Sequence, residues 1–294
     1  MESILVVLGI IFPVFAVAVS GYLYARFRRG GTDLSVTNRV YLEIFTPALI
    51  FSVMSDAEFD LLSYTSLTAA GVVVILITGV IAVAAAKVMK TDVKTLVPPL
   101  MFNNSGNMGL PLAVFAFGEE GLAAATVLFI VENFMHFTFG SWILAAHFHI
   151  KPLIRLPMFW GAFLGIVVNL AGIKLVEPLG DAISMLGQIS IPLLLFSLGA
   201  RVAQTHVTHF RLAIAANVLN VSATLLVGLL LISLFSLEGM QAAQFILFCA
   251  LPPAVLNFML AEQYGQEPDK VASIVLLGNV SSILVIPVVL YFIL

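Results

Sequence analysis

Four asparagines interrupt apolar stretches of this chain, and their side chains are suited to binding an anion. Asn103, Asn104 and Asn107 lie within the apolar run 96–118, which is long enough to cross a bilayer, and Asn257 lies in a later run. Each asparagine side chain supplies two N–H donors and one acceptor. A half-helix that begins at a break also presents unpaired N–H groups and the positive end of its dipole. We therefore expect a site that holds a carboxylate without a lysine or arginine, unless the amides serve only to satisfy the broken backbone.

Prolines and glycines surround these asparagines and predict where the two helices break. A proline inside a helix removes a backbone hydrogen bond, and lipid offers the freed group no other partner. Irregular backbone at membrane depth is therefore tolerated only where it is buried in protein or lines a cavity. The alternative is a continuous, kinked helix whose asparagines join neighbouring helices. The crossover or hinge candidates are Pro98, Pro99, Gly109, Pro111, Pro252 and Pro253, and the substrate-binding candidates are Asn103, Asn104, Gly106, Asn107, Asn133 and Asn257.

Three ionisable side chains fall near these predicted breaks. Glu132 and His136 are four residues apart in an apolar run, which places them on one face of a helix. Ionisable groups inside a membrane are costly and usually functional, so we expect this pair to exchange a proton or contact a bound solute, with a structural hydrogen bond as the alternative. Glu262 is a candidate cation ligand near the crossover or, equally, a charge on the cytoplasmic rim.

The composition is that of an integral membrane protein. Hydrophobic residues make up 61% of the 294 positions and charged residues 10%, whereas a soluble domain carries about 25% charged residues. We expect the lipid bilayer as partner and no nucleic acid. The single cysteine, Cys249, excludes a disulfide framework and a thiolate metal site. We expect no metal and no cofactor, and we interpret the spaced histidines His147, His149, His206 and His209 as solvated surface residues.

Apolar runs of about 20 residues, the length that crosses a bilayer, predict ten spans. These are residues 4–25, 36–54, 64–86, 96–117, 122–146, 157–176, 180–200, 212–236, 241–262 and 270–293. Twelve of the 13 Lys and Arg residues fall in the connections that follow odd-numbered spans. By the positive-inside rule these connections are cytoplasmic, so both termini are expected outside the cytoplasm of a multi-pass plasma (inner) membrane protein. The first run is expected to be a retained span rather than a signal peptide.

The two halves of the chain repeat one another in sequence. The segment that starts Pro47-Ala-Leu-Ile matches the one that starts Pro192-Leu-Leu-Leu, and the double proline before Asn103 matches the one before Asn257. The matched pairs, at offsets of 144 to 154 residues, are Pro13 with Pro157, Gly21 with Gly165, Pro47 with Pro192, Pro98 with Pro252 and Asn133 with Asn279. Five spans per half would invert the second half. Paired interrupted helices in inverted halves point to a secondary transporter whose site lies near the bilayer midplane.

These motifs resemble a known family. The run Asn-Asn-Ser-Gly-Asn-Met-Gly-Leu-Pro-Leu at 103–112, the double-proline element at Asn257 and the five-plus-five spans are similar to the auxin efflux carriers, within the larger group that includes the bile-acid sodium symporters. The resemblance implies a scaffold domain, 1–63 and 152–205, and a mobile transport domain, 64–151 and 206–294, with spans four and nine crossing at the site. Only residues 147–156 separate the halves, which points to the short microbial members associated with malate or malonate.

We therefore expect an all-α membrane protein that acts as a secondary transporter of a small organic anion, such as malate, malonate or an auxin-like acid. An elevator-type mechanism, a homodimer through the scaffold, and a proton or sodium ion as coupling partner are expected. In a bile-acid-like sodium symporter, sodium would be held by carbonyls with Ser105, Asn107 and Glu262. An enzyme is disfavoured, since Glu132 and His136 lack the second histidine of a His-Glu-x-x-His zinc site. An ion channel is disfavoured too, because it would need a ring of pore-lining residues from an oligomer rather than an internal inverted repeat.

Overall fold

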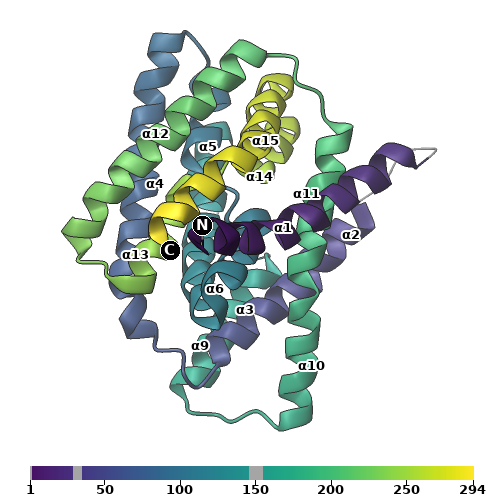
Figure 1. Ribbon diagram of the computed structural model, residues 1–294, viewed down its shortest axis with the longest axis vertical. Coiled ribbons are helices and arrows are strands. Elements are labelled where there is room, and N and C mark those ends of the chain that lie inside the picture. Colours follow the sequence, from purple (N-terminus) through teal and green to yellow (C-terminus); the bar gives the residue numbers. More distant parts are fainter. Residues whose placement is uncertain (1, 29–34, 146–154) are drawn as a thin grey trace.

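The computed structural model describes residues 2–28, 35–145 and 155–294, and in these residues the protein is helical without a β-strand (Figure 1). The helices are α1 (Glu2–Phe27), α2 (Ser35–Val40), α3 (Thr46–Ser55), α4 (Thr65–Met89), α5 (Val93–Met101), α6 (Leu110–Met135), α7 (Ser141–Ala145), α9 (Pro157–Leu170), α10 (Glu177–Gln188), α11 (Ser190–Gln204), α12 (Phe210–Phe235), α13 (Gly239–Ala250), α14 (Val255–Tyr264) and α15 (Pro268–Ile293). Three π-helical turns, η1 (Tyr41–Phe45), η3 (Ser105–Gly109) and η4 (His136–Gly140), and the 3-10 turn η2 (Leu61–Tyr64) complete them.

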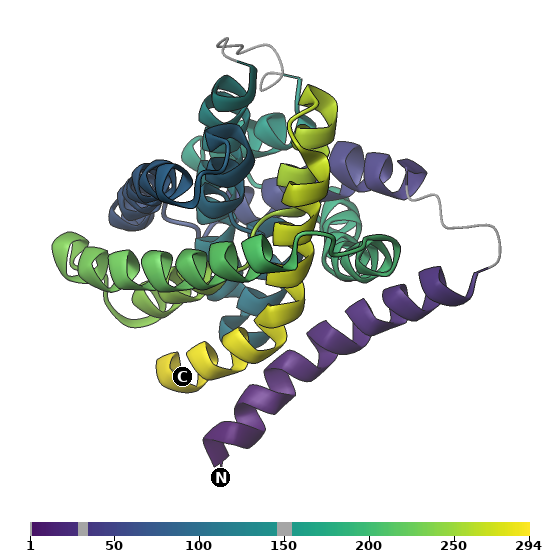
Figure 2. The ribbon, with the colours of Figure 1, turned by 90° about the horizontal axis from the view of Figure 1, so that it is seen from above.

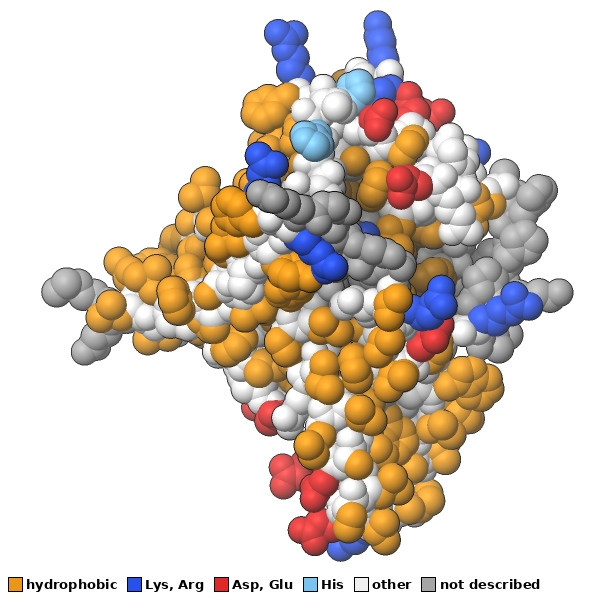
Figure 3. All heavy atoms as spheres, turned by 90° about the vertical axis from the view of Figure 1, so that its right-hand side faces the viewer, with side chains coloured by type: hydrophobic (Ala, Val, Ile, Leu, Met, Phe, Trp, Pro, Cys, Tyr) orange, Lys and Arg blue, Asp and Glu red, His pale blue; other side chains and the backbone are white. Residues whose placement is uncertain are grey.

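Apolar helices long enough to cross a membrane dominate this structure. Among the described residues six helical stretches meet that length and hydropathy, and three more apolar helices are shorter. Figure 3 shows a broad hydrophobic surface, with basic and histidine side chains gathered over its upper part and acidic side chains also at its lower end. The chain is thus a helical membrane protein by the character of its spans. Helix occurs in all ten predicted regions, while the ten-span count and the five-plus-five repeat remain predictions.

One of the predicted span boundaries is wrong. The predicted span 157–176 ends early, because α9 stops at Leu170 and Gly172 then adopts a left-handed conformation with φ of 63°. A glycine in that conformation is a common helix terminator. The predicted connection at 118–121 begins at a break in α6, because Gly118 has non-helical backbone angles, φ of 67° and ψ of −152°, and two helical stretches meet there at a kink. The central connection lies outside the described residues at 147–154, together with His147, His149 and Lys151.

Helix α1 runs along one flank of the molecule and packs against α11 (Figure 2). The contact is close because Gly21 has no side chain: a Cβ there would overlap the carbonyl oxygen of Phe196. Helices α9 and α3 pack in the same manner, where a Cβ on Gly165 would lie 3.0 Å from the carbonyl oxygen of Phe51. Small residues allow helix backbones to approach within a membrane. The matched pairs Gly21 with Gly165 and Phe51 with Phe196 therefore make matching contacts.

The remaining long helices pack on one another around the broken segments. Helix α4 contacts α5, α6 and α12, and α15 contacts α12, α13 and α14. The prolines behave differently in the two halves. Pro98 and Pro99 lie inside α5, which continues to Met101, whereas Pro252 and Pro253 lie in the break after α13. Pro111 is at the start of α6, where a helix tolerates proline because the first N–H groups have no intrahelical acceptor.

Candidate functional site

The two predicted helix breaks exist and bind each other through their backbones. The chain leaves helix after α5 and again after α13, and Asn103 pairs with Pro253 as an isolated antiparallel bridge. The Asn104 N–H donates to the carbonyl oxygen of Pro252 at 2.7 Å, and the Ala254 N–H donates to that of Phe102 at 3.0 Å. Backbone groups freed by each break thus find their partners in the other.

The side chains of Asn103 and Asn257 strengthen this crossing. Asn103 Nδ2 donates to the carbonyl oxygen of Phe248 at 3.1 Å, and Asn257 Nδ2 donates to that of Phe102 at 3.0 Å. Both asparagines are buried, at 6% and 1% exposure. Their Oδ1 atoms have no partner among the described residues. Each amide therefore donates one hydrogen bond to the backbone, and its acceptor oxygen has no partner among the described residues.

Asn279 is a third amide at the crossing, and the sequence did not single it out as a site residue. Asn104 Nδ2 donates to Asn279 Oδ1 at 2.7 Å, and Asn279 Nδ2 donates to the carbonyl oxygen of Pro253 at 3.0 Å. The repeat contained the signal, since Asn279 is the match of the candidate Asn133. Asn133 itself donates only within its own helix, to Phe129 at 2.8 Å.

Glu132 is fixed to the first break. Its carboxylate accepts hydrogen bonds from the backbone N–H of Asn103 and from Ser105 Oγ, and the residue is 2% exposed. A carboxylate at the start of a helical segment satisfies N–H groups that lack an intrahelical acceptor and interacts favourably with the helix dipole. Glu132 thus occupies part of the donor-rich region that a substrate anion would otherwise use.

His136 does not pair with Glu132, although both side chains line the same cavity. Its ring stacks on Phe102, with centroids 4.1 Å apart and planes inclined by 6°, and it lies beside the Asn257 side chain. Its Nε2 is buried without a hydrogen-bond partner among the described residues. Glu132 and His136 therefore make separate contacts at the first break, Glu132 with Asn103 and Ser105 and His136 with Phe102.

A cavity of about 120 Å³ lies against the crossing. Seven predicted site residues line it: Asn103, Asn104, Gly106, Asn107, Glu132, Asn133 and His136. The starts of η3 and α14 also border it, and the first N–H groups of a helix have no intrahelical acceptor. Asn257 is not among the lining residues, and Glu262 lines a separate cavity of about 390 Å³. Along the described chain, no group of three or more His, Cys, Asp or Glu is placed to hold a metal ion.

Arg201 is a site residue that sequence reasoning missed. We expected it in the connection after span 180–200, but α11 continues to Gln204 and Arg201 lines both cavities. The predicted span ended just before Arg201, whereas a long side chain can keep its charge in a polar cavity while the helix goes on. The cavity thus has a cation in its lining, which the sequence did not predict.

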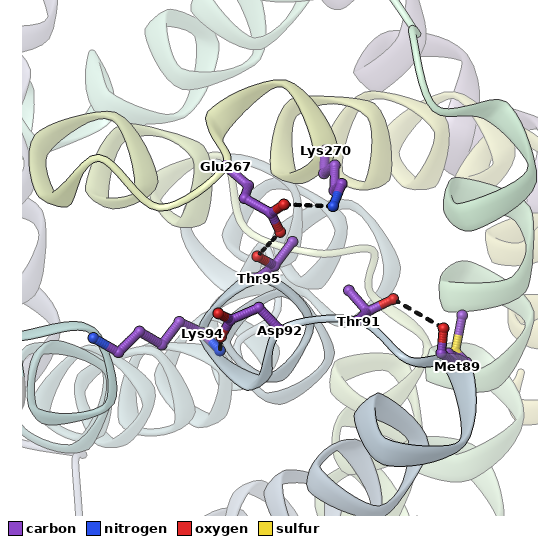
Figure 4. Close-up of polar contacts among 7 residues, drawn as sticks. All are labelled: Met89, Thr91, Asp92, Lys94, Thr95, Glu267 and Lys270. Carbon is purple, nitrogen blue, oxygen red and sulfur yellow. Dashed lines mark hydrogen bonds and ion pairs between the residues drawn. The ribbon is translucent and has the colours of Figure 1, made fainter.

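A polar cluster joins the start of α5 to the start of α15 (Figure 4). Thr95 in α5 is fully buried and donates to Glu267 Oε2 at 2.6 Å, just before α15 begins. Lys270 pairs with the other oxygen of Glu267. Asp92 caps α5 by accepting the Lys94 N–H at 2.8 Å. These contacts fix the start of α5 to the start of α15.

Comparison with known proteins identifies the family. Residues 143–290, half of the chain, match the family described as membrane transport protein. The chain belongs to this family. A membrane transport protein was the class that the interrupted, repeated helices indicated, and the transporter prediction is confirmed at that level.

Three relatives of the chain are similar to it over most of their length. An "uncharacterized transporter" of Methanothermobacter thermautotrophicus is 26% identical over 97% of this chain and 96% of its own. A "Putative malonate transporter" of Rhizobium meliloti is 24% identical, over 97% and 95% respectively. Another "uncharacterized transporter", from Methanocaldococcus jannaschii, is 22% identical over 85% and 87%. All three bear the name of transporters.

Proposed function

We propose that this membrane transport protein is a secondary transporter of small organic anions, and that its substrates are short carboxylates such as malonate or malate. The observation that supports this most is the 120 Å³ cavity bordered by two paired helix breaks. The Asn107 amide and Arg201 line it and the starts of two helices border it, and all of these supply donors or positive charge that favour an anion. The name of the Rhizobium meliloti relative agrees with a short dicarboxylate.

The size of the cavity bears on the alternative substrate class. A bile-acid-like sodium symporter must accommodate a steroid, which is much larger than malonate. A volume of about 120 Å³ suits a solute of a few heavy atoms. We therefore favour the short carboxylate over the steroid acid.

We further propose an elevator-type motion of residues 64–151 and 206–294 against a dimeric scaffold of residues 1–63 and 152–205. The close packing of α1 on α11 and of α3 on α9 supports a rigid scaffold. The crossing ties the breaks after α5 and α13 together, so both would move as one body. Cysteine pairs that bridge α3 and α6, in a Cys249→Ser background, should stop turnover reversibly. Unchanged transport by the cross-linked protein would contradict the motion.

We propose that transport is coupled to protons through Glu132 and His136, which both line the cavity. Both oxygens of the Glu132 carboxylate accept hydrogen bonds from the first break. A proton on either oxygen would turn an acceptor into a donor, so protonation would loosen the contact with Asn103 or Ser105. Sodium held by carbonyls with Ser105 and Asn107 is the rival. Uptake that follows a sodium gradient, ignores a pH step and survives Glu132→Gln would refute the proton coupling.

The substrate class is tested by binding to the purified protein. Thermal unfolding in detergent is followed with a panel of acetate, malonate, succinate, malate and taurocholate. We expect the short carboxylates to raise the unfolding temperature in proportion to their affinity, because a ligand that binds only the folded state stabilises it. Stabilisation by taurocholate alone would favour the bile-acid-like alternative, and stabilisation by none would contradict the proposal.

A further inference from the structure

The part of the cavity lining that η1, α3 and α11 contribute has four polar side chains. Tyr41 of η1, Thr46 of α3, and Ser197 and Arg201 of α11 all line the cavity. Thr46 is 1% exposed and Ser197 is 3% exposed, and the hydroxyl of each has no hydrogen-bond partner among the described residues. A buried hydroxyl without a partner costs free energy, so a bound ligand that supplies the partner is stabilised. We name these four residues the Arg201 wall.

The local helix geometry brings the Arg201 wall together. Ser197 and Arg201 are four residues apart, which places both on one face of α11. Tyr41 and Thr46 are five apart, and the π-helical turn compensates for the extra residue: the Thr46 N–H donates to the carbonyl oxygen of Tyr41. Single π-helical turns occur often at functional sites. The insertion thus aligns two hydroxyl groups with the cavity.

Arg201 lacks a protein counter-ion. The ion pair between Lys270 and Glu267 is the one formed among the described residues, so Arg201 has no carboxylate partner there. Its guanidinium interacts electrostatically with the Tyr41 hydroxyl. A partly buried cation without a carboxylate is unfavourable unless an anion joins it. Among the described residues, the cavity therefore has one positive charge without a counter-ion, at Arg201 of α11.

We infer that the Arg201 wall is a second carboxylate subsite, so that the cavity holds a dicarboxylate by both ends. One carboxylate binds the free N–H groups at the starts of η3 and α14, and the other binds the Arg201 guanidinium with Tyr41, Thr46 and Ser197. Arginine suits this role because its planar group binds a carboxylate through two parallel hydrogen bonds. The inference rests on the proposed function, and it narrows the substrate class from carboxylates to dicarboxylates.

The test compares a dianion with its half-ester. Calorimetry measures the dissociation constants of malonate and monomethyl malonate for the wild type, Arg201→Gln and Arg201→Lys, with the exposed Arg211→Gln as matched control. We expect the wild type to prefer malonate by about tenfold or more, as the loss of a charge-assisted pair predicts. Arg201→Gln should lose that preference while it keeps its affinity for the half-ester. Arg201→Lys should keep part of it, and Arg211→Gln all of it.

The outcomes separate this inference from the proposed function. If the wild type binds both ligands and Arg201→Gln keeps the preference for malonate, the second subsite is wrong and the proposed function stands. If the wild type binds neither ligand, the proposed function fails and the inference fails with it. Should Arg201→Gln not fold, Ser197→Ala and Thr46→Val replace it, since each removes only a hydroxyl. Each should weaken malonate about threefold and leave the half-ester unchanged, and an equal effect on both ligands contradicts the subsite.

Discussion

Asn103 and Asn257 make the same hydrogen bond in opposite directions across the crossing. Asn103 donates to the carbonyl oxygen at Phe248, near the end of α13, and Asn257 donates to that at Phe102, after the end of α5. Each amide thus closes the helix end of the other half. These residues hold the site together in addition to any contact that they make with a substrate.

The first prediction concerns these two amides. Asn103→Ala and Asn257→Ala should each lower the free energy of unfolding by about 1 to 2 kcal/mol, because a buried carbonyl loses a hydrogen-bond donor. Asn107→Ala is the matched control, since the Asn107 side chain lines the cavity and makes no hydrogen bond among the described residues. Thermal unfolding that fails to distinguish Asn103→Ala from Asn107→Ala would contradict the structural role.

The second prediction concerns Glu132. Glu132→Ala leaves the Asn103 N–H and the Ser105 hydroxyl without their acceptor, which should cost about 2 to 6 kcal/mol of stability, since each lost partner costs about 1 to 3 kcal/mol. The loss should shrink in Glu132→Ala with Ser105→Ala, because one of the stranded donors is then absent. A double-variant cycle in denaturant measures this coupling. Strict additivity of the two substitutions would show that the hydrogen bond contributes nothing.

The third prediction concerns the contact between α1 and α11. Gly21→Ala places a Cβ against the Phe196 carbonyl oxygen, so the two backbones must separate. Overpacking of this kind costs about 1 to 3 kcal/mol. Gly9→Ala on the same helix is the control, since nothing lies within 4 Å of its added Cβ. Unfolding temperatures should fall for Gly21→Ala and not for Gly9→Ala, and equal values would refute the close packing.

The fourth prediction concerns pH and Glu267. The hydrogen bonds from Lys270 and then Thr95 hold the pKa of Glu267 below its ordinary value of 4.5. A depressed pKa in the folded state means that this contact stabilises the protein above pH 4.5 and that its contribution is lost as the pH falls below that value. Glu267 is largely exposed, so solvent screens the effect and keeps it small.

The measurement compares the unfolding temperatures of the wild type and Glu267→Gln at several pH values. The wild type should be the more stable at neutral pH, and the difference should narrow below pH 4.5. High salt should narrow it too. A difference that grows as the pH falls would contradict the assignment.

Much of the crossing could be predicted from the sequence, because its signals are local. Clustered prolines, glycines and asparagines in apolar runs predict both breaks, and the repeat matches Asn103 with Asn257. The repeat also matched Gly21 with Gly165, and the structure shows that both lie in close helix contacts. These features depend on residue type and spacing, which the chain displays directly.

The Arg201 wall could not be predicted from the sequence, because it depends on tertiary packing. Tyr41 and Arg201 are far apart in the sequence and meet only where η1 lies beside α11. Neither residue breaks an apolar pattern deeply enough to mark a site. The partners of Glu132 and His136 were hidden for the same reason, since helical periodicity gives the face of a side chain but not the element that covers it.

The most direct test of the account is exchange of labelled malonate by the purified protein in liposomes. Vesicles preloaded with unlabelled malonate should take up the label several-fold faster than vesicles without it, because a carrier returns faster when loaded. Asn107→Ala, which folds normally in this account, should reduce that uptake, since it removes a donor from the cavity. Uptake by the wild type that is no faster with preloading than without it, or no faster than in protein-free vesicles, would contradict the claim that this cavity transports small carboxylates.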